Sequence, residues 1–428
     1  MKIAPKTVKA RAMAQMLFTS AIEAVDPKLA LQRALKAHPV APGGADGHLF
    51  VLALGKAAIS MATAFQDAVG QNGAMGQIAQ MIVVTNPENI RPIVGAEVLA
   101  TSHPLPSQAG ADAANQVEAM LQKVGAQDTV VALISGGGSA LLPAPKAGIS
   151  LEDKIAVNAL LLANGLDIRQ MNLIRQSLSR LKGGGMVLAA APAPVVAFIL
   201  SDVIGDDLAV IASGPTVAPI GTPQEACAIL KKGGLWEALP ASVQTVLTSP
   251  HQVPKTLQAT QNILIASNTL ALAAMAQAAP ISTQIVNAAL IGDVEAAASQ
   301  IIAAAQDWDQ KTPTVLLFGG ETTVTLRGTG LGGRNQELAL LIAQKANLLP
   351  PNFVFLSGGT DGRDGPTDAA GGMVDAQSWQ RIIQGGGDPV ALLANNDSNR
   401  ALALAGDLVI TGATGTNVAD VQVLILQP

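Results

Sequence analysis

The amino-acid sequence predicts a doubly wound α/β protein that folds into two domains. Its 428 residues exceed what a single hydrophobic core usually supports. Short apolar runs alternate along the chain with alanine- and leucine-rich stretches of helical length, which is the order of elements in α/β folds. Most of these runs are apolar at every position, as in parallel strands that are buried on both faces.

The expected strands end at glycines or polar residues. In chain order they are Leu49–Leu54, Met81–Thr85, Thr129–Ser135, Val195–Ser201, Asn262–Ser267, Thr314–Gly320, Thr323–Leu326, Phe353–Gly359 and Asp407–Ala413. The helices expected between them include Ala109–Val124, Asp153–Asn164, Val294–Asp307 and Asn335–Lys345. The N-terminus predicts an amphipathic helix that carries Met13, Met16, Leu17 and Ala21 on one face.

The segment Thr248–Lys255 predicts the domain boundary, because it is polar, contains Pro250 and Pro254, and shows no periodicity. We therefore expect a first domain over residues 1–245 and a second over residues 255–428.

Composition excludes several classes of protein. The net charge of −5 and the aromatic content of 2% argue against a nucleic-acid partner, which requires basic surface and stacking rings. The single cysteine, Cys227, excludes an internal disulfide and is expected to be reduced, as in cytoplasm. The longest apolar stretch, Met186–Leu200, contains Pro192 and Pro194 and is shorter than the ~20 residues of a membrane span. We expect a cytoplasmic protein without a membrane segment.

Ligands of open α/β sheets bind beyond the carboxyl ends of the strands, so the residues that follow each strand are the site candidates. The first strand is followed by Gly55 and Lys56, and the third by a loop of glycines and serines. The members of that loop are Ser135, Gly136, Gly137, Gly138 and Ser139.

Three successive glycines let backbone N–H groups approach an anion closely, which favours a phosphate or carboxylate ligand. The alternative is a tight turn, for which one glycine would suffice. Lys56 is placed to bind a phosphate as a point charge. Its alternative is a solvated lysine, although cations are disfavoured at the start of a helix.

Acidic residues at later strand ends suit phosphoryl transfer, which needs Mg²⁺ and a group that accepts a proton. Asp202 is the first candidate for the base or a metal ligand, and Asp361 is a second candidate metal ligand. Asp206 and Asp207 are as well explained by helix capping. Nucleotide binding is also assigned to Gly319, Gly320 and Glu321, which end another strand.

The segment Gly328–Glu337 has two interpretations. Gly328, Gly330 and Gly333 match the G-x-G-x-x-G pattern of dinucleotide-binding loops. The strand before them is short, however, and Arg334 and Asn335 stand at the helix start where a pyrophosphate would meet bare backbone. Arg334 is better explained as a bidentate clamp on a carboxylate or a moving phosphoryl group, with Asn335 as a substrate contact.

Two more candidates for substrate binding lie in the first half. His103 stands on a proline-rich loop, where a structural histidine is an equal alternative. Arg175 belongs to the stretch Asp167–Gly185, expected to be one helix with Arg175, Ser179 and Lys182 on one face.

Several long motifs are specific enough to be compared with known families. In the first half they are SHPLPSQAGADAA, LISGGGSALL, NLIRQSLSRLKGGG and LSDVIGDDLAVIASGPT, and in the second half FGGETTVTLRGTGLGGRNQELAL, LSGGTDGRDGPTDAAGG and TGATGTNVADVQ. Together they resemble the class II glycerate 2-kinase family. The likeness follows the chain in order over nearly its whole length. It implies an N-terminal Rossmann-like domain, a C-terminal α/β domain and an active site in the cleft between them.

The resemblance also implies ATP- and Mg²⁺-dependent phosphorylation of D-glycerate at its 2-hydroxyl, with Lys56 and Arg334 as catalytic residues. Two alternatives are kept beside this kinase: a hydroxypyruvate reductase that uses NAD(P)H at Gly328–Gly333, and a regulator that senses a nucleotide or sugar phosphate. A homodimer is left open.

Overall fold

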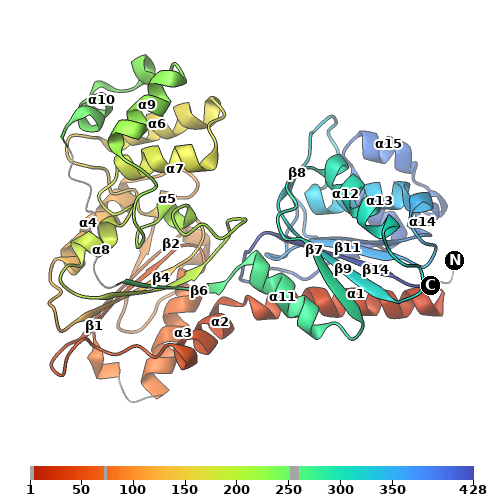
Figure 1. Ribbon diagram of the computed structural model, residues 1–428, viewed down its shortest axis with the longest axis horizontal. Coiled ribbons are helices and arrows are strands. Elements are labelled where there is room, and N and C mark those ends of the chain that lie inside the picture. Colours follow the sequence, from red (N-terminus) through yellow and green to blue (C-terminus); the bar gives the residue numbers. More distant parts are fainter. Residues whose placement is uncertain (1–3, 72–74, 251–259) are drawn as a thin grey trace. The chain divides into compact units, whose positions relative to one another are not determined.

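The computed structural model describes residues 4–71, 75–250 and 260–428, and within them the chain divides into two units (Figure 1). The N-terminal unit comprises the described residues of Pro27–Ser201 and Asp206–Ile265. The C-terminal unit comprises the described residues up to Asp26, together with Asp202–Gly205 and Ala266–Pro428. No helix in the described ranges is long and apolar enough to cross a membrane.

The N-terminal sheet confirms the expected Rossmann-like fold. Its strands are β1 (Leu49–Leu54), β2 (Ile78–Thr85), β3 (Glu97–Ala100), β4 (Thr129–Ile134), β5 (Val195–Leu200) and β6 (Thr260–Ala266). They lie in the order β3-β2-β1-β4-β5-β6, and the pairings from β3 to β5 are parallel. This order reverses between β1 and β4, and such a topological switch point is where doubly wound sheets bind ligands.

Helices cover both faces of this sheet and form a separate layer beside it (Figure 1). Around the sheet lie α2 (Pro27–Ala37), α3 (Ala58–Gln71), α4 (Gln108–Leu121), α5 (Gly138–Leu141) and α8 (Gly185–Ala189). The separate helical layer contains α6 (Leu151–Ala163), α7 (Ile168–Ser177), α9 (Pro223–Lys232) and α10 (Ala241–Thr248). Capping boxes start α6 and α7, and Leu161, Ile174 and Leu230 belong to the core of this layer.

The C-terminal sheet is mixed. Its strands are β7 (Ser282–Asn287), β9 (Thr314–Gly320), β11 (Val354–Gly359), β12 (Gly371–Asp375), β13 (Leu408–Val409) and β14 (Asp420–Leu426). Their order is β13-β12-β11-β14-β9-β7, in which β7 pairs with β9 in parallel and the other described pairings are antiparallel. The expectation of parallel strands is wrong for this half, because burial on both faces makes a strand apolar throughout whatever its direction.

Both faces of the C-terminal sheet are covered by helices (Figure 1). On one face lie α1 (Pro5–Ala24) and α11 (Asn268–Ala278), which pack on each other. The helices against the other face are α12 (Val294–Gln306), α13 (Arg334–Gln344), α14 (Ser378–Gln384), α15 (Pro389–Ala394) and α16 (Ser398–Ala405). Phe318 and Phe355 are fully buried in the core between the sheet and α12 and α13.

Several sequence-based boundaries need correction. The short strands β8 (Gly292–Asp293) and β10 (Thr322–Thr323) pair with each other, apart from the large sheets. Of the expected strand Thr323–Leu326, only Thr323 is in a strand. Of the expected strand Asp407–Ala413, only Leu408 and Val409 are, as β13. Helix α1 buries Ala10, Ala14, Leu17, Phe18 and Ala21, whereas Met16 is 41% exposed. The stretch Asp167–Gly185 is not one helix, because α7 ends at Ser177.

The two units also differ from the ranges 1–245 and 255–428. The described residues before Pro27 belong to the C-terminal unit because α1 packs on β11 and β14, and β6 belongs to the N-terminal sheet. The expected boundary, Thr248–Lys255, falls mostly outside the described residues. The two domain ranges stay a prediction.

An ion-pair network fastens α1 to the C-terminal unit. The Arg11 guanidinium donates to Asp375 at 2.7 Å and to Asp407 at 2.9 Å, and Arg381 pairs with the same two carboxylates. Both aspartates are buried, so the cost of burying their negative charges is offset by the two arginines.

We expect Arg11→Met to lower the free energy of unfolding by about 3 kcal/mol, because the variant leaves two buried carboxylates with a single arginine. Urea denaturation measures the change. Lys9→Met removes an exposed cation from the same helix and should stay within about 0.5 kcal/mol of the wild type. Equal losses in the two variants would contradict the structural role of this network.

Candidate active site

The loops after β1 and β4 are joined at the switch point of the N-terminal sheet. The Lys56 N–H donates to the Gly136 carbonyl at 2.9 Å, and the Ala57 N–H donates to the Ser135 hydroxyl at 3.1 Å. Gly55 has a φ of +119°, and a Cβ there would lie 2.2 Å from the Ser135 hydroxyl oxygen. The glycine before Lys56 is therefore required by the close approach of these two loops.

The glycine loop presents backbone donors. In the described part of the chain, no intramolecular acceptor is found for the N–H groups of Gly136, Gly137, Gly138 and Ser139. Successive unpaired N–H groups form a concave site for an anion. The hydroxyl groups of this loop serve the fold instead, since Ser139 Oγ lies 2.9 Å from Ser213 Oγ and Ser135 Oγ donates to the Leu54 carbonyl.

Lys56 and His103 lie against this loop. A Cβ on Gly137 would be 3.1 Å from His103 Cδ2 and 3.4 Å from Lys56 Cγ. The Lys56 side chain is exposed and forms no ion pair with any residue that the structure describes. Partial burial and the charge of Lys56 lower the pKa of His103, so the imidazole is neutral at neutral pH.

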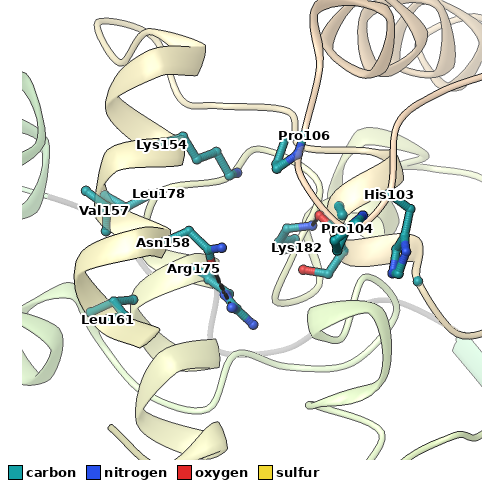
Figure 2. A pocket seen from close by; sticks show the side chains of 13 residues that line it. His103, Pro104, Pro106, Lys154, Val157, Asn158, Leu161, Arg175, Leu178 and Lys182 are labelled. Atoms are coloured by element: carbon teal, nitrogen blue, oxygen red, sulfur yellow. Dashed lines mark hydrogen bonds between the residues drawn. The ribbon is translucent and has the colours of Figure 1, made fainter. Parts of the chain in front are cut away.

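A pocket beside the loop is lined on its far side by α6 and α7 (Figure 2). We call it the cation pocket, and its described lining residues are His103, Pro104, Pro106, Gly137, Ser139, Ala140, Lys154, Val157, Asn158, Leu161, Arg175, Leu178 and Lys182. None of these lining residues is acidic. Sequence analysis predicted Arg175 and His103 here but missed Lys154 altogether, because nothing in the sequence marks a lysine that will be buried.

Lys182 is only 5% exposed, and its ammonium group donates to the carbonyls of Ser139 and Leu142. Burial, together with the charge of Arg175, lowers the pKa of Lys182 to about 7. The folded protein therefore releases this proton well below the pH at which the unfolded chain does.

Because the unfolded chain holds the proton up to its ordinary pKa of 10.5, stability should rise with pH above about 7. We expect the free energy of unfolding to gain about 2 kcal/mol from this group between pH 7 and 9. Lys182→Met should lose that gain in denaturation measured at both pH values. Lys123→Met, which removes an exposed lysine, is the control, and an unchanged pH dependence in Lys182→Met would contradict the assignment.

Arg334, at the start of α13, is held by two carboxylates. Its Nε and Nη2 donate to Asp420 at 2.6 and 3.1 Å, and its Nη1 donates to Glu321 at 2.9 Å. Burial by itself lowers the pKa of Arg334, but the hydrogen bonds and charge of Asp420 outweigh it and raise that pKa. Asp420 is 1% exposed, whereas the Arg334 side chain is 34% exposed and can reach a ligand.

Two further aspartates lie near Arg334. Asp364 accepts from the N–H groups of Asn335 and Gln336 at 3.1 and 2.8 Å, so it caps α13. Asp361 is half-buried, and its Oδ1 accepts from the Arg363 N–H at 3.0 Å. Burial is the main cause that raises the pKa of both aspartates, and the charge of Asp420 adds to it.

The loop Gly328–Gly333 does not have the structure of a dinucleotide-binding loop. The N–H groups of its first four residues are already bonded: those of Gly328 and Thr329 donate to the side chains of Asn396 and Asn395, and those of Gly330 and Leu331 donate to the Asn395 carbonyl and the Asp397 side chain. A Cβ on Gly330 would lie 2.5 Å from the Asp397 side chain, so this glycine serves close packing against residues 395–397. Because the N–H groups of Asn335 and Gln336 at the start of α13 donate to the Asp364 carboxylate, they are not available to a pyrophosphate.

Other predicted residues are used inside the C-terminal unit. The buried Asn335 side chain bonds to Ser357 at 2.6 Å and to Asp364 at 3.3 Å. Gly319 and Gly320 lie in β9, where a Cβ would meet Asn268 and Leu290 respectively. Their roles toward a ligand stay predictions, as does the expectation of a site in a cleft between the domains.

The structure thus brings Gly55, Lys56, His103 and Arg175 to one side of the N-terminal unit, around Gly136–Ser139. It brings Glu321, Arg334 and Asp361 together in the C-terminal unit. Asp202 lies two residues after the end of β5 but is counted with the C-terminal unit. Arg175 and Lys182 share a pocket rather than the expected helix face, since Lys182 lies beyond the end of α7.

Two family models match the chain. A domain of unknown function, DUF4147, covers residues 13–248, and the MOFRL family covers residues 314–420. The DUF4147 match therefore spans the switch point and the cation pocket. The MOFRL match spans Arg334 and the acidic residues near it, Glu321, Asp361 and Asp420.

Named relatives match nearly the full length. The chain is 38% identical to a glycerate kinase of Homo sapiens, covering 97% of this chain and 93% of that protein. It is 36% identical to a glycerate 2-kinase of Pyrococcus horikoshii, covering 96% of each. The crystal structure of a glycerate kinase from Thermotoga maritima superposes with a TM-score of 0.89 at 35% identity, covering 97% of this chain and 99% of that one.

Proposed function

Because the chain belongs to the class II glycerate 2-kinase family, we propose that it transfers the terminal phosphoryl group of ATP to the 2-hydroxyl group of D-glycerate. The oxygen of that hydroxyl forms a bond to the γ-phosphorus while the bond to the β–γ bridging oxygen breaks. The products are 2-phospho-D-glycerate and ADP, and the proton of the hydroxyl passes to a carboxylate.

The observation that carries this proposal is the junction of the two loops at the switch point. Among the described residues, the four N–H groups of Gly136–Ser139 have no intramolecular acceptor, and the neighbouring Lys56 side chain, whose Cγ would lie 3.4 Å from a Cβ on Gly137, forms no ion pair. Backbone N–H groups and an ammonium group both favour phosphate oxygens. Fixed donors aimed at oxygens that gain charge in the transition state are the main means of catalysing phosphoryl transfer.

Arg334 supplies the second positive group. Asp420 fixes two of its nitrogens, so the guanidinium is oriented before a ligand arrives. Its remaining N–H bonds are proposed to neutralise the moving phosphoryl group and the glycerate carboxylate.

Asp361 fits a Mg²⁺ ion by its chemistry. It is a half-buried carboxylate with only one oxygen bonded to the backbone, and its raised pKa reflects a cost that a bound cation would offset. A Mg²⁺ ion held there would neutralise negative charge on the phosphate groups. Asp202 is proposed as the group that accepts the hydroxyl proton, with a metal contact as its alternative role. Cytoplasmic location and a homodimer stay predictions.

The reductase alternative loses its support in the structure. It requires the backbone of Gly328–Gly333 to hold a pyrophosphate, but the N–H groups of Gly328, Thr329 and Leu331 are already bonded to side chains of residues 395–397.

The test is an assay with D-glycerate and MgATP beside one with hydroxypyruvate and NADH or NADPH. We expect glycerate-dependent release of ADP, with 2-phosphoglycerate identified by phosphorus NMR. Nicotinamide oxidation without ADP release would overturn the kinase, and 3-phosphoglycerate as product would overturn the choice of hydroxyl.

A further inference from the structure

The cation pocket gathers more basic side chains than the fold uses. Lys154 and Lys182 are 7% and 5% exposed, and the half-buried Arg175 lines the same pocket (Figure 2). Lys154 comes from α6, Arg175 from α7, and Lys182 from the segment between α7 and α8. Three separate elements therefore converge to place cations around one hollow.

The partners of these cations are neutral. The Lys154 ammonium donates to the Pro143 carbonyl, and Lys182 donates to the carbonyls of Ser139 and Leu142. The Arg175 Nε and Nη2 both donate to the Asn158 side-chain oxygen, at 2.9 and 2.5 Å. Each cation keeps at least one N–H bond without a partner among the described residues.

Charges buried in this way are costly unless an anion joins them. Burial and the neighbouring cations hold the pKa of Lys154 well below its ordinary value, and Lys182 is affected in the same way. The nearby Arg180, by contrast, is paired with Glu118 at 2.6 Å, which shows how the fold neutralises a cation that has a purely structural role.

We propose that the cation pocket binds the polyphosphate chain of the nucleotide, with the nucleoside against the apolar wall formed by Val157, Leu161 and Leu178. Three cations exceed what one carboxylate can use, whereas a di- or triphosphate carries several charges along its length. Glycerate is small and wholly polar, so it would gain nothing from the apolar wall. The adjoining N–H groups of Gly136–Ser139 extend the same anion site toward Lys56.

This inference rests on the proposed kinase function and makes it more specific. It assigns Arg175 to the binding of the nucleotide instead of the binding of glycerate. It also assigns nucleotide contacts to Lys154 and Lys182.

Titration calorimetry with MgADP, and separately with inorganic tripolyphosphate, tests the proposal on the full chain. We expect Arg175→Gln to weaken the binding of both by about 10- to 100-fold, as the loss of charge-assisted hydrogen bonds predicts. The KM for glycerate should change less than twofold. Lys182→Gln tests the deepest cation, and circular dichroism checks that each variant is folded.

Arg169→Gln is the matched control. Arg169 lies on the same helix, is 60% exposed and pairs with Asp207, so its loss removes an equal charge outside the pocket. MgADP should bind to it as to the wild type.

The outcomes separate the two claims. Unchanged binding of MgADP and tripolyphosphate by folded Arg175→Gln overturns the inference while glycerate phosphorylation stands. A raised KM for glycerate with unchanged MgADP binding also overturns it and returns Arg175 to the acceptor. If Arg175→Gln binds tripolyphosphate more weakly but the wild-type protein does not phosphorylate glycerate, the pocket is an anion site and the proposed kinase function is wrong.

Discussion

Replacing Lys56 with methionine is expected to lower kcat/KM for glycerate by about 10²- to 10³-fold. The Lys56 side chain lies against Gly137 at its Cγ and forms no ion pair with the described residues, so we expect its charge to be available to the transferred phosphoryl group. Initial rates at saturating MgATP measure the loss.

Stability should not change in Lys56→Met, because the side chain is exposed and its removal leaves no buried partner. Lys56→Arg keeps the positive charge and should retain part of the activity. If Lys56→Met turns over glycerate at the wild-type rate, the proposed role of Lys56 is wrong. If Lys56→Met unfolds, its loss of activity carries no information on catalysis. The activity of Lys56→Arg then shows whether a positive charge is needed at this position.

The second large effect is expected at Arg334, where both activity and stability should fall. Arg334→Met leaves the carboxylate of Asp420 buried and unpaired, which should cost about 3–5 kcal/mol of unfolding free energy. The kcat/KM for glycerate should fall by at least about 10²-fold, because a bidentate cation is lost.

A double variant separates these two effects. Arg334→Met combined with Asp420→Asn removes the unpaired charge and should recover most of the stability without recovering turnover. Arg334→Lys restores a point charge but not the fork that Asp420 holds, so it should be stable and weakly active. A double variant as active as the wild type would exclude Arg334 from catalysis.

The Lys56 loops were predictable because their signal is local. A buried strand, a glycine and a lysine stand next to one another in the sequence, and the order of a doubly wound sheet brings the ends of β1 and β4 together. Arg334 was predictable as a position but not as an interaction, since Asp420 lies 86 residues away. Nothing local marks that aspartate as its partner.

For a related reason, neither the directions of the C-terminal strands nor the burial of Lys154 could be predicted from the sequence. An apolar run such as β11 or β14 records burial on both faces, which parallel and antiparallel neighbours provide equally. Lys154 looks like any lysine of an amphipathic helix, and only the packing of α6 against the Pro143 carbonyl makes it a buried cation. Both properties are decided by residues distant in the chain.

The place of α1 has a consequence for synthesis on the ribosome. This helix is synthesised well before the strands it covers, β11 and β14, which are completed only at Gly359 and Leu426. At typical elongation rates of ~5–20 residues per second, the part of its face that packs on these strands stays without them for roughly 20–80 s. The N-terminal unit, whose last strand ends at Ala266, can be folded by then. Phe18, which is fully buried against Gly358 of β11 in the folded protein, therefore waits for this partner until most of the C-terminal unit has been translated.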